Sequence, residues 1–365
     1  MARLSRVAVA VLKKLGAAAL VVWITATVVF LALRASGDPL EAILGGPGSQ
    51  AGPETAAQAT AAYGLDQPVF VQYLQQLWRI ATLQFGDSYA RKQPVSELLA
   101  ANVPPTLALA TLAFALAWAL ALAGTLLAAN ARGRAGAVAR ALLTAVETVA
   151  SVVPQFFLGA VLILVFATGL RWFPATGAAA GGLPALVLPV ITLAVPVAGY
   201  LAHVLHGPLT EADRSPFATT ARARGANESR VLARHTLRHA ALPAIALSGW
   251  AYGSLLSGAV VVEVLFARQG LGRLLLEAAT VRDVPVVIGA VVVVALLYVL
   301  VMIVSEIVET LVDPRGGRAA AARAGGVGGD RSGGPSRSGG SGRSGGGGAP
   351  GSSATRTTAG SEMIA

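Results

Sequence analysis

The sequence predicts an all-α, polytopic membrane protein with six transmembrane helices, and three observations support this fold class. Hydrophobic residues make up 55% of the 365 residues and charged residues only 13%, which is too few charges to cover a soluble domain. Several uncharged runs approach the roughly 20 residues that a helix needs to cross a bilayer. Basic residues also gather in alternate connections between these runs, as in membrane proteins of fixed orientation.

Six runs of the chain are apolar enough to be predicted as spans. The first, residues 15–33, follows four basic residues and is longer than the apolar core of a typical signal peptide, so we predict an uncleaved helix. The other spans are predicted within residues 103–131, 141–170, 183–205, 240–262 and 284–305.

The distribution of Lys and Arg predicts the orientation. If the N-terminus is cytoplasmic, the cytoplasmic segments hold 20 of the 28 Lys and Arg residues. The positive-inside rule therefore places both termini in the cytoplasm. The formal net charge of +10 is interpreted as a consequence of topology, so no nucleic-acid partner is expected.

The segments outside the spans differ in character. Residues 1–14 are the predicted cytoplasmic N-terminus, and residues 34–102 form an extracytoplasmic insertion. Within the insertion, apolar residues recur at helical spacing from Pro68 to Trp78, which predicts an amphipathic helix lying on the membrane or on a partner subunit.

The remaining segments follow the insertion. Residues 103–315 form the predicted core, which includes a second outside loop with a helical centre around Leu271–Ala279. Residues 316–365 are rich in Gly, Ser and Arg, a composition that predicts a disordered cytoplasmic tail.

A long cytoplasmic loop at residues 206–239 has a readable local pattern. Thr219–Arg224 can form a short helix, and Gly225 allows a left-handed turn after it. Asn227 is expected to cap the next helix, on which Arg230, Arg234 and Arg238 would share one face. Pro243 is predicted in the first turn of the fifth span.

The arginines of this loop have two interpretations. On charge alone, they only fix the topology of the neighbouring spans. Alternatively, the small residues Ala221 and Ala223 let another protein surface approach, while Arg222 and Arg224 offer it charge-directed contacts.

Several kinds of chemistry find no support in the sequence. The chain has no cysteine and no Gly-x-x-x-x-Gly-Lys-Ser/Thr segment, so we expect no thiol chemistry, no ATP bound by this chain and no cofactor. His203 and His206 are three apart, and His235 and His239 four apart, without accompanying carboxylates. We interpret all four as loop residues near lipid headgroups rather than metal ligands.

Charges and prolines within the spans indicate where a polar pathway could cross the membrane. Glu147 is the clear charge within the first five spans and is expected to face a partner subunit or the pathway. Pro154, followed by Gln155, is predicted to break the third helix, and Pro189 and Pro196 to break the fourth.

The order of residues in the long loop resembles the dipeptide/oligopeptide permease family of ABC importers. Residues 220–225 read Thr-Ala-Arg-Ala-Arg-Gly, where that family has Thr-Ala-Arg-Ala-Lys-Gly. Residues 234–243 read Arg-His-Thr-Leu-Arg-His-Ala-Ala-Leu-Pro, where it has His-Ala-Leu-Arg-Asn-Ala-Leu-Leu-Pro. Similar segments continue over roughly residues 1 to 315, and include 63–68, 85–88, 105–107, 258–263, 270–272, 282–285 and 313–315.

This resemblance implies the type I ABC importer permease fold, and the insertion after the first span implies the first of two permease subunit types. It also implies that the loop couples ATPase subunits to the membrane domain, as a mechanical joint without catalysis. The coupling residues carried over are Thr219, Thr220, Ala221, Arg222, Ala223, Arg224, Gly225, Arg234, His235, Arg238 and Pro243. Glu147, Pro154 and Gln155 are the candidates for the translocation pathway.

The resemblance further implies a set of partners in a bacterial inner membrane. These are a second homologous permease subunit, two ATPase subunits that use ATP, and an extracytoplasmic substrate-binding protein. The implied cargo is di- or oligopeptides, and nickel or another small solute is the alternative within the family. Outside the family, the alternatives are a secondary transporter, for which inverted repeats and intramembrane ionisable pairs are expected, and a membrane-embedded enzyme.

Overall fold

The computed structural model describes the backbone of residues 2–35, 37, 40, 43–44, 52–131, 133–176, 182–227 and 230–312. Within these ranges, side chains 2–15, 33, 62–63, 233–235, 238–239 and 309–312 are outside the description. The predicted disordered tail at 316–365 lies outside the described residues and stays a prediction.

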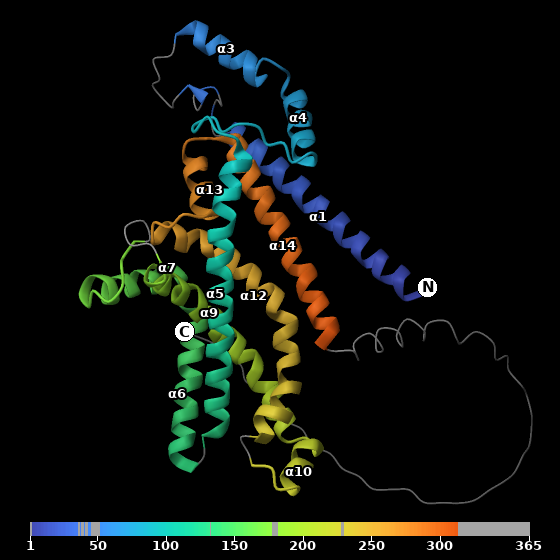
Figure 1. The fold of residues 1–365 in the computed structure, drawn as a ribbon, viewed down its shortest axis with the longest axis vertical. Helices are drawn as coiled ribbons and strands as arrows, with labels where there is room; N and C mark the ends of the chain where they lie inside the picture. The colour runs from blue at the N-terminus through green and yellow to red at the C-terminus, as the bar shows by residue number, and fades with distance from the viewer. Residues whose placement is uncertain are drawn as a thin grey trace, which may run out of the picture. The chain divides into compact units, whose positions relative to one another are not determined.

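The regular elements of the described residues are helices, which confirms the predicted all-α class. The α-helices are α1 (Ala2–Ala35), α3 (Pro53–Tyr63), α4 (Val69–Ala81), α5 (Val95–Asn130), α6 (Gly133–Val152), α7 (Gln155–Leu162), α9 (Pro184–Asp213), α10 (Pro216–Ala223), α12 (Leu237–Leu265), α13 (Leu271–Thr280) and α14 (Val284–Val312). Two segments are π-helical, η1 (Ile163–Gly169) and η2 (Val231–Thr236). Figure 1 shows their arrangement.

Five of these helices are long and apolar enough to cross a membrane. They are α5, α6, α9, the part of α12 from Ala240 to Leu265, and the part of α14 from Val284 to Val308. The first predicted span lies in α1, whose described side chains include the apolar stretch Gly16–Ala32. The described residues therefore support five full-length spans of the predicted six, and an apolar helix at the position of the first.

The third predicted span, residues 141–170, is not one helix. Helix α6 ends at Val152 and α7 begins at Gln155, so the predicted break at Pro154 is confirmed. Pro154 is extended, with φ −60° and ψ 133°, and it has no N–H to continue the helical hydrogen bonds. Figure 1 shows α6 and α7 running in different directions.

The cytoplasmic connection predicted between the second and third spans, at residues 130–140, is also wrong. Helix α6 begins at Gly133, close after the end of α5 at Asn130. Gly133 has a φ of +70°, a left-handed conformation that glycine adopts without strain and that permits the tight reversal. Most of the predicted loop therefore belongs to α6, which packs along α5.

Helix α9 corrects two further predictions. It runs unbroken from Pro184 to Asp213 through Pro189 and Pro196, because a proline in a well-packed membrane helix can be accommodated by its neighbours. Those neighbours are α5, α6, α7 and α12. Since α9 extends past the predicted end at residue 205, His203 and His206 lie on a helix and not in a loop.

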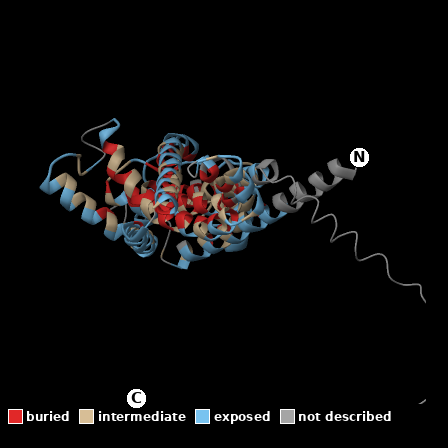
Figure 2. Ribbon diagram, turned by 90° about the horizontal axis from the view of Figure 1, so that it is seen from below, coloured by how far each residue is buried: buried red, intermediate tan, exposed pale blue. Residues whose placement is uncertain are grey.

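Two groups of buried residues position the helices. One lies where α5, α9 and α12 meet and includes Leu109, Leu201 and Leu255. The other joins α5, α13 and α14 and includes Val95 and Ile288. Figure 2 shows the buried positions gathered in the middle of the helices and exposed positions around them.

The amphipathic helix predicted in the insertion is confirmed as α4. It packs on α1, where the hydroxyls of Tyr73 and Thr27 lie 2.7 Å apart and Arg34 donates to Gln72 at 2.8 Å. Phe70 and Trp78 on α4 are exposed. Contact of this helix with the membrane or a partner subunit stays a prediction.

Candidate functional site

The predicted coupling stretch forms the short helix α10. Residues 219–223 lie within it, and Thr219, Thr220 and Ala223 are exposed while Ala221 and Arg222 are half-buried. Ala218 is fully buried, and α10 packs on η2 and α9. One side of α10 is thus fixed to the protein and the other is open to a partner.

The turn that follows α10 has the predicted geometry. Gly225 has a φ of +82°, and nothing lies within 4 Å of the position that a Cβ would take there. The Arg230 N–H donates to the Asn227 side-chain oxygen at 2.9 Å, so Asn227 caps the next helical segment as predicted. Arg224 is exposed beside this turn.

Arg222 has a partner within its own chain. Its guanidinium donates to the backbone oxygen of Asp213 at 2.9 Å and forms an ion pair with the Asp213 carboxylate. This contact ties α10 to the end of α9, whereas the sequence analysis assigned Arg222 to contacts with another protein. The sequence pattern gave no signal for Asp213, because the pair is nine residues apart across a turn.

The remaining coupling residues lie beyond α10. The side chains of Arg234, His235 and Arg238 are outside the described residues, so the face predicted for the arginines stays a prediction. The backbone of Val231–Thr236 is π-helical, and α12 begins at Leu237. Pro243 therefore lies in the second turn of α12, not in the first, because the helix starts before the apolar run does.

Glu147 forms a hydrogen bond to His206 that the sequence did not predict. Its Oε2 lies 2.6 Å from Nε2 of His206, and the Glu147 side chain is 13% exposed. The pair joins α6 to α9. The other oxygen, Oε1, is buried and has no hydrogen-bond partner among the described residues. His206 is therefore a hydrogen-bond partner of Glu147 between two packed helices, which corrects its interpretation as a loop residue.

Small residues make room for this pair. A Cβ at Gly124 of α5 would lie 2.6 Å from Oε1 of Glu147, and one at Gly199 of α9 would lie 2.4 Å from its backbone oxygen. Both contacts are closer than real Cβ atoms allow, so glycine at each position lets α6 approach its neighbours. Ionisable pairs between membrane helices were expected only for the secondary-transporter alternative, and this chain contains one.

Pro154 and Gln155 occupy a different place. Gln155 begins α7, and a Cβ at Gly258 of α12 would lie 2.3 Å from its side-chain oxygen. Glu147 lies against α5 and α9, whereas Gln155 lies against α12. The three candidate pathway residues are therefore not one cluster among the described residues.

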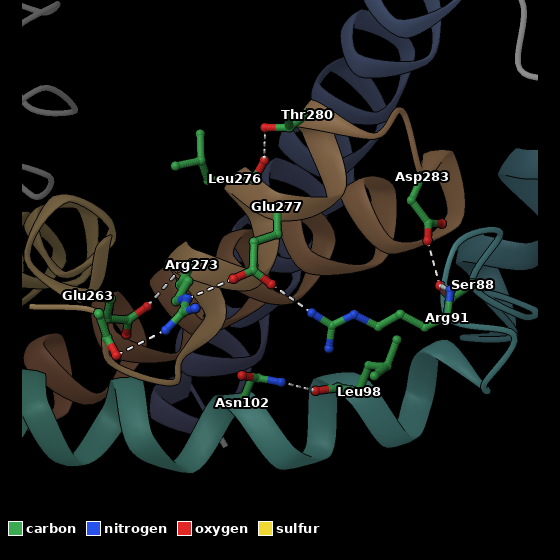
Figure 3. Close-up of polar contacts among 11 residues, drawn as sticks. Ser88, Arg91, Leu98, Asn102, Glu263, Arg273, Leu276, Glu277, Thr280 and Asp283 are labelled. Carbon is green, nitrogen blue, oxygen red and sulfur yellow. Dashed lines mark hydrogen bonds and ion pairs between the residues drawn. The ribbon is translucent and has the colours of Figure 1, made fainter. Parts of the chain in front are cut away.

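The opposite end of α12 carries a buried carboxylate, Glu263, which is 1% exposed. It accepts hydrogen bonds from the Thr106 hydroxyl at 2.5 Å and from the backbone N–H groups of Gly272 and Arg273 at 2.8 and 3.2 Å. Thr106 in turn accepts from the Leu271 N–H at 2.8 Å. These contacts hold the start of α13 against α5 and α12, as Figure 3 shows in part.

A second buried carboxylate, Asp283, holds the other end of α13. It accepts from the Ser88 hydroxyl at 2.5 Å and from the backbone N–H groups of Tyr89 and Ala90, both at 3.1 Å. On the surface between the two carboxylates, Glu277 pairs with Arg91 and Arg273 at 2.7 Å each, which Figure 3 also shows. Glu263 and Asp283 fall within the segments 258–263 and 282–285 that resemble the permease family, but no sequence pattern predicted a role for either.

Arg268 follows Glu263 in the connection to α13. Its guanidinium donates to the backbone oxygen of Ala185 at 3.1 Å. Burial lowers the pKa of Arg268 from its usual value, and the nearby Glu263 carboxylate opposes this effect. The contact links the start of α9 to the end of α12.

Comparison with known proteins identifies the family to which this chain belongs. Residues 121–317 match the family described as the inner membrane component of binding-protein-dependent transport systems. The matched region includes α10, the Glu147–His206 pair and both buried carboxylates. The chain belongs to this family.

Relatives along the chain agree with the family match. A Brucella abortus protein, whose name assigns it to a peptide transport system as a permease, is 35% identical over 84% of this chain and 98% of its own length. The oligopeptide transport system permease OppB of Haemophilus influenzae is 32% identical over 78% of this chain and 91% of its own. The oligopeptide transport system permease AppB of Bacillus subtilis is 33% identical over 78% of this chain and 92% of its own length.

The family membership settles the coarse function. This chain is a multi-pass inner membrane component of a transport system that works with a binding protein. The predicted ABC permease family is confirmed by this match and by the relatives. A family of transport permeases also supports a role without catalysis.

Proposed function

We propose that this chain is the transmembrane permease subunit of an ATP-driven, binding-protein-dependent importer of di- or oligopeptides. Its relatives are named for peptide or oligopeptide transport, and one of 33% identity is the glutathione transport permease GsiC of Salmonella choleraesuis. Glutathione is itself a small peptide, so the names share one class of cargo.

One structural observation carries the mechanism, namely the setting of α10. This helix presents an exposed face of small and polar residues and is joined to the end of α9 through Arg222 and Asp213. A partner that pulls on the exposed face would transmit the force to α9, because the ion pair links the two helices. We assign this face to an ATPase subunit.

The proposed orientation places α10 in the cytoplasm and α13 outside the cell. Both chain termini are then cytoplasmic, in agreement with the excess of Lys and Arg on that side. A second homologous permease completes the pathway, two ATPase subunits bind the cytoplasmic coupling helices, and a binding protein delivers peptide from outside. This chain binds no ATP itself.

The transport step in this proposal is alternating access. When the ATPase subunits close on ATP, they draw α10 of each permease together. The movement passes to α9 and from there to α5, α6 and α12, because these three helices pack against α9. Rotation of these helices opens the pathway outward, and release of the hydrolysis products returns it to the inward-facing state.

Co-purification tests the composition of this assembly. The full chain, extracted from native membranes in mild detergent, is expected to carry a second permease and ATPase subunits, identified by mass spectrometry. Uptake of labelled di- and oligopeptides by the reconstituted assembly should require ATP. A chain that purifies alone and transports without ATP would contradict the proposal and favour a secondary transporter, whereas ATP-dependent uptake of nickel and not of peptides would contradict the cargo alone.

A further inference from the structure

A polar cavity of about 310 Å³ lies at the α10 end of the molecule, among α5, α6, α9 and η2. Its walls combine cationic and hydroxyl side chains, and include Thr125, Arg140, His206, Asp213 and Arg214. Neither the coupling role of α10 nor the Glu147–His206 pair requires such a space. Its chemistry therefore needs its own explanation.

The charges that line the cavity do not cancel. The Asp213 carboxylate is engaged by Arg222, and the His206 ring nitrogen Nε2 is engaged by Glu147. Arg140 and Arg214 are exposed, and neither forms an ion pair with a carboxylate in the described part of the chain. Two guanidinium groups thus face the cavity without a counter-charge.

A buried hydroxyl also belongs to the wall of the cavity. Thr125 is fully buried, and its Oγ1 has no hydrogen-bond partner among the described residues. Buried polar groups in folded proteins are satisfied in the great majority of cases. Because Thr125 lines the cavity, an acceptor within the cavity would satisfy it.

The helix ends around the cavity modify this charge but do not reverse it. The carboxyl ends of α5 and α9 each contribute roughly half a negative charge. Against two full guanidinium charges, these contributions leave the cavity positive. A single arginine guanidinium can donate two parallel hydrogen bonds to phosphate oxygens, which adds geometric fit to the attraction between the charges.

We propose that this cavity binds a phosphate-bearing anion through Arg140, Arg214 and the Thr125 hydroxyl. The phosphate comes either from the headgroup of an anionic phospholipid or from a soluble phosphate. The proposal does not depend on which solute is transported.

An occupant would connect two helices. It would bridge Arg140 of α6 and Arg214 at the end of α9, next to the Asp213 carboxylate that holds α10. A bound anion therefore stabilises the junction of α9 and α10. The stability of this junction would then depend on the supply of anionic lipid or soluble phosphate.

Lipid retention and phosphate binding test the site on the full chain, purified with whatever subunits accompany it. Native mass spectrometry after exchange into phosphatidylglycerol or phosphatidylcholine micelles measures bound lipid, and calorimetry with inorganic phosphate and with glycerol 3-phosphate measures soluble ligands. We expect one bound anion per chain. Its affinity should fall by at least about tenfold in R140Q/R214Q, because the charge-assisted hydrogen bonds from the two arginines are lost.

Two variants keep the result interpretable. Thr125→Val removes the hydroxyl without breaking any hydrogen bond of the described protein, so it should weaken anion binding while leaving thermal stability unchanged or raised. Arg134→Gln removes the same charge from an exposed position of α6 that does not line the cavity, and should leave binding intact.

Each outcome decides the proposal. Retention of phosphatidylglycerol with no response to soluble phosphate supports a lipid headgroup, and binding of the soluble phosphates supports a free anion. Absence of both, or equal loss of binding in Arg134→Gln and R140Q/R214Q, would overturn the site and leave only a diffuse basic surface.

Discussion

The two ends of α12 are held in different ways. At the Glu263 end, two buried carboxylates accept hydrogen bonds mainly from backbone N–H groups of other segments. At the α10 end, the links between helices are pairs of side chains, Arg222 with Asp213 and His206 with Glu147. In Figure 1, α13 lies near the top and α10 at the bottom.

This difference separates a fixed region from a movable one. Breaking the Glu263 contacts would leave several buried donors without partners, a large cost in a water-poor interior. The Arg222–Asp213 pair is partly exposed, with side chains 29% and 46% accessible, so water can replace its contacts at little cost. A helix that moves during transport is expected to belong to the second kind.

The largest effect on stability is expected from Glu263→Ala. The substitution leaves the buried N–H of Gly272 and the partly buried N–H of Arg273 without their acceptor, and the Thr106 hydroxyl keeps only its longer bond to the Asn102 carbonyl, which should destabilise the protein by about 3 kcal/mol or more. A fall in the thermal unfolding temperature of the purified chain, with reduced yield, measures it.

The matched control for this substitution is Glu277→Gln. Glu277 lies in the same region but is exposed, with a side chain 43% accessible and two arginine partners. Its loss should change stability by less than about 1 kcal/mol. If both variants were equally destabilised, the buried carboxylate would have no special role in fixing this end.

An intermediate effect is expected from Glu147→Gln. It removes the charge from a pair that joins α6 to α9 and leaves His206 without its anionic partner, at a cost of about 1–3 kcal/mol. Thermal unfolding measures the loss. The double variant with His206→Asn should recover part of the stability, and a double variant no better than the sum of the two single ones would show that the two side chains act independently.

The smallest effect on stability, and the largest on transport, is expected from Arg222→Glu. It places a carboxylate beside Asp213 at the partly exposed junction of α9 and α10, so the free energy of unfolding should change by less than about 1 kcal/mol. ATP-dependent uptake should nevertheless fall by at least about tenfold, because the link between α10 and α9 is broken. Normal uptake by this variant would contradict the proposed transmission.

A substitution at Gly225 tests the turn that follows α10. Gly225 has a left-handed φ, which a β-branched residue adopts only with strain of about 1–3 kcal/mol. Gly225→Val should therefore distort the turn after α10 and reduce uptake while the protein still inserts in the membrane. Uptake is compared with that of Ala226→Val, a neighbouring substitution without the left-handed requirement.

Local patterns could be predicted from the sequence where one residue type determines the backbone. The turn at Gly225, the cap at Asn227 and the break at Pro154 depend on conformational limits of single residues, and all three are present. The amphipathic pattern from Pro68 to Trp78 likewise gave α4, because its periodicity is set by the helix itself.

Contacts between distant segments could not be predicted in this way. Glu147 and His206 are 59 residues apart, and Ser88 and Asp283 are 195 apart, so no spacing in the sequence connects them. The prolines of α9 misled for a related reason, since packing by the surrounding helices allows the helix to continue through them. Pairing and packing depend on the fold, and a single sequence holds no direct record of either.

The central claim is that the exposed face of α10 contacts an ATPase subunit, and site-directed crosslinking tests it most directly. The chain has no cysteine, so Thr219→Cys on α10 and Leu276→Cys on α13, both exposed, each introduce one thiol. In the assembly purified from membranes, a thiol–amine crosslinker should join Cys at 219 to an ATPase subunit, and the thiol at 276 should not react with one. Crosslinking to an ATPase from residue 276, or none from residue 219, would contradict the account.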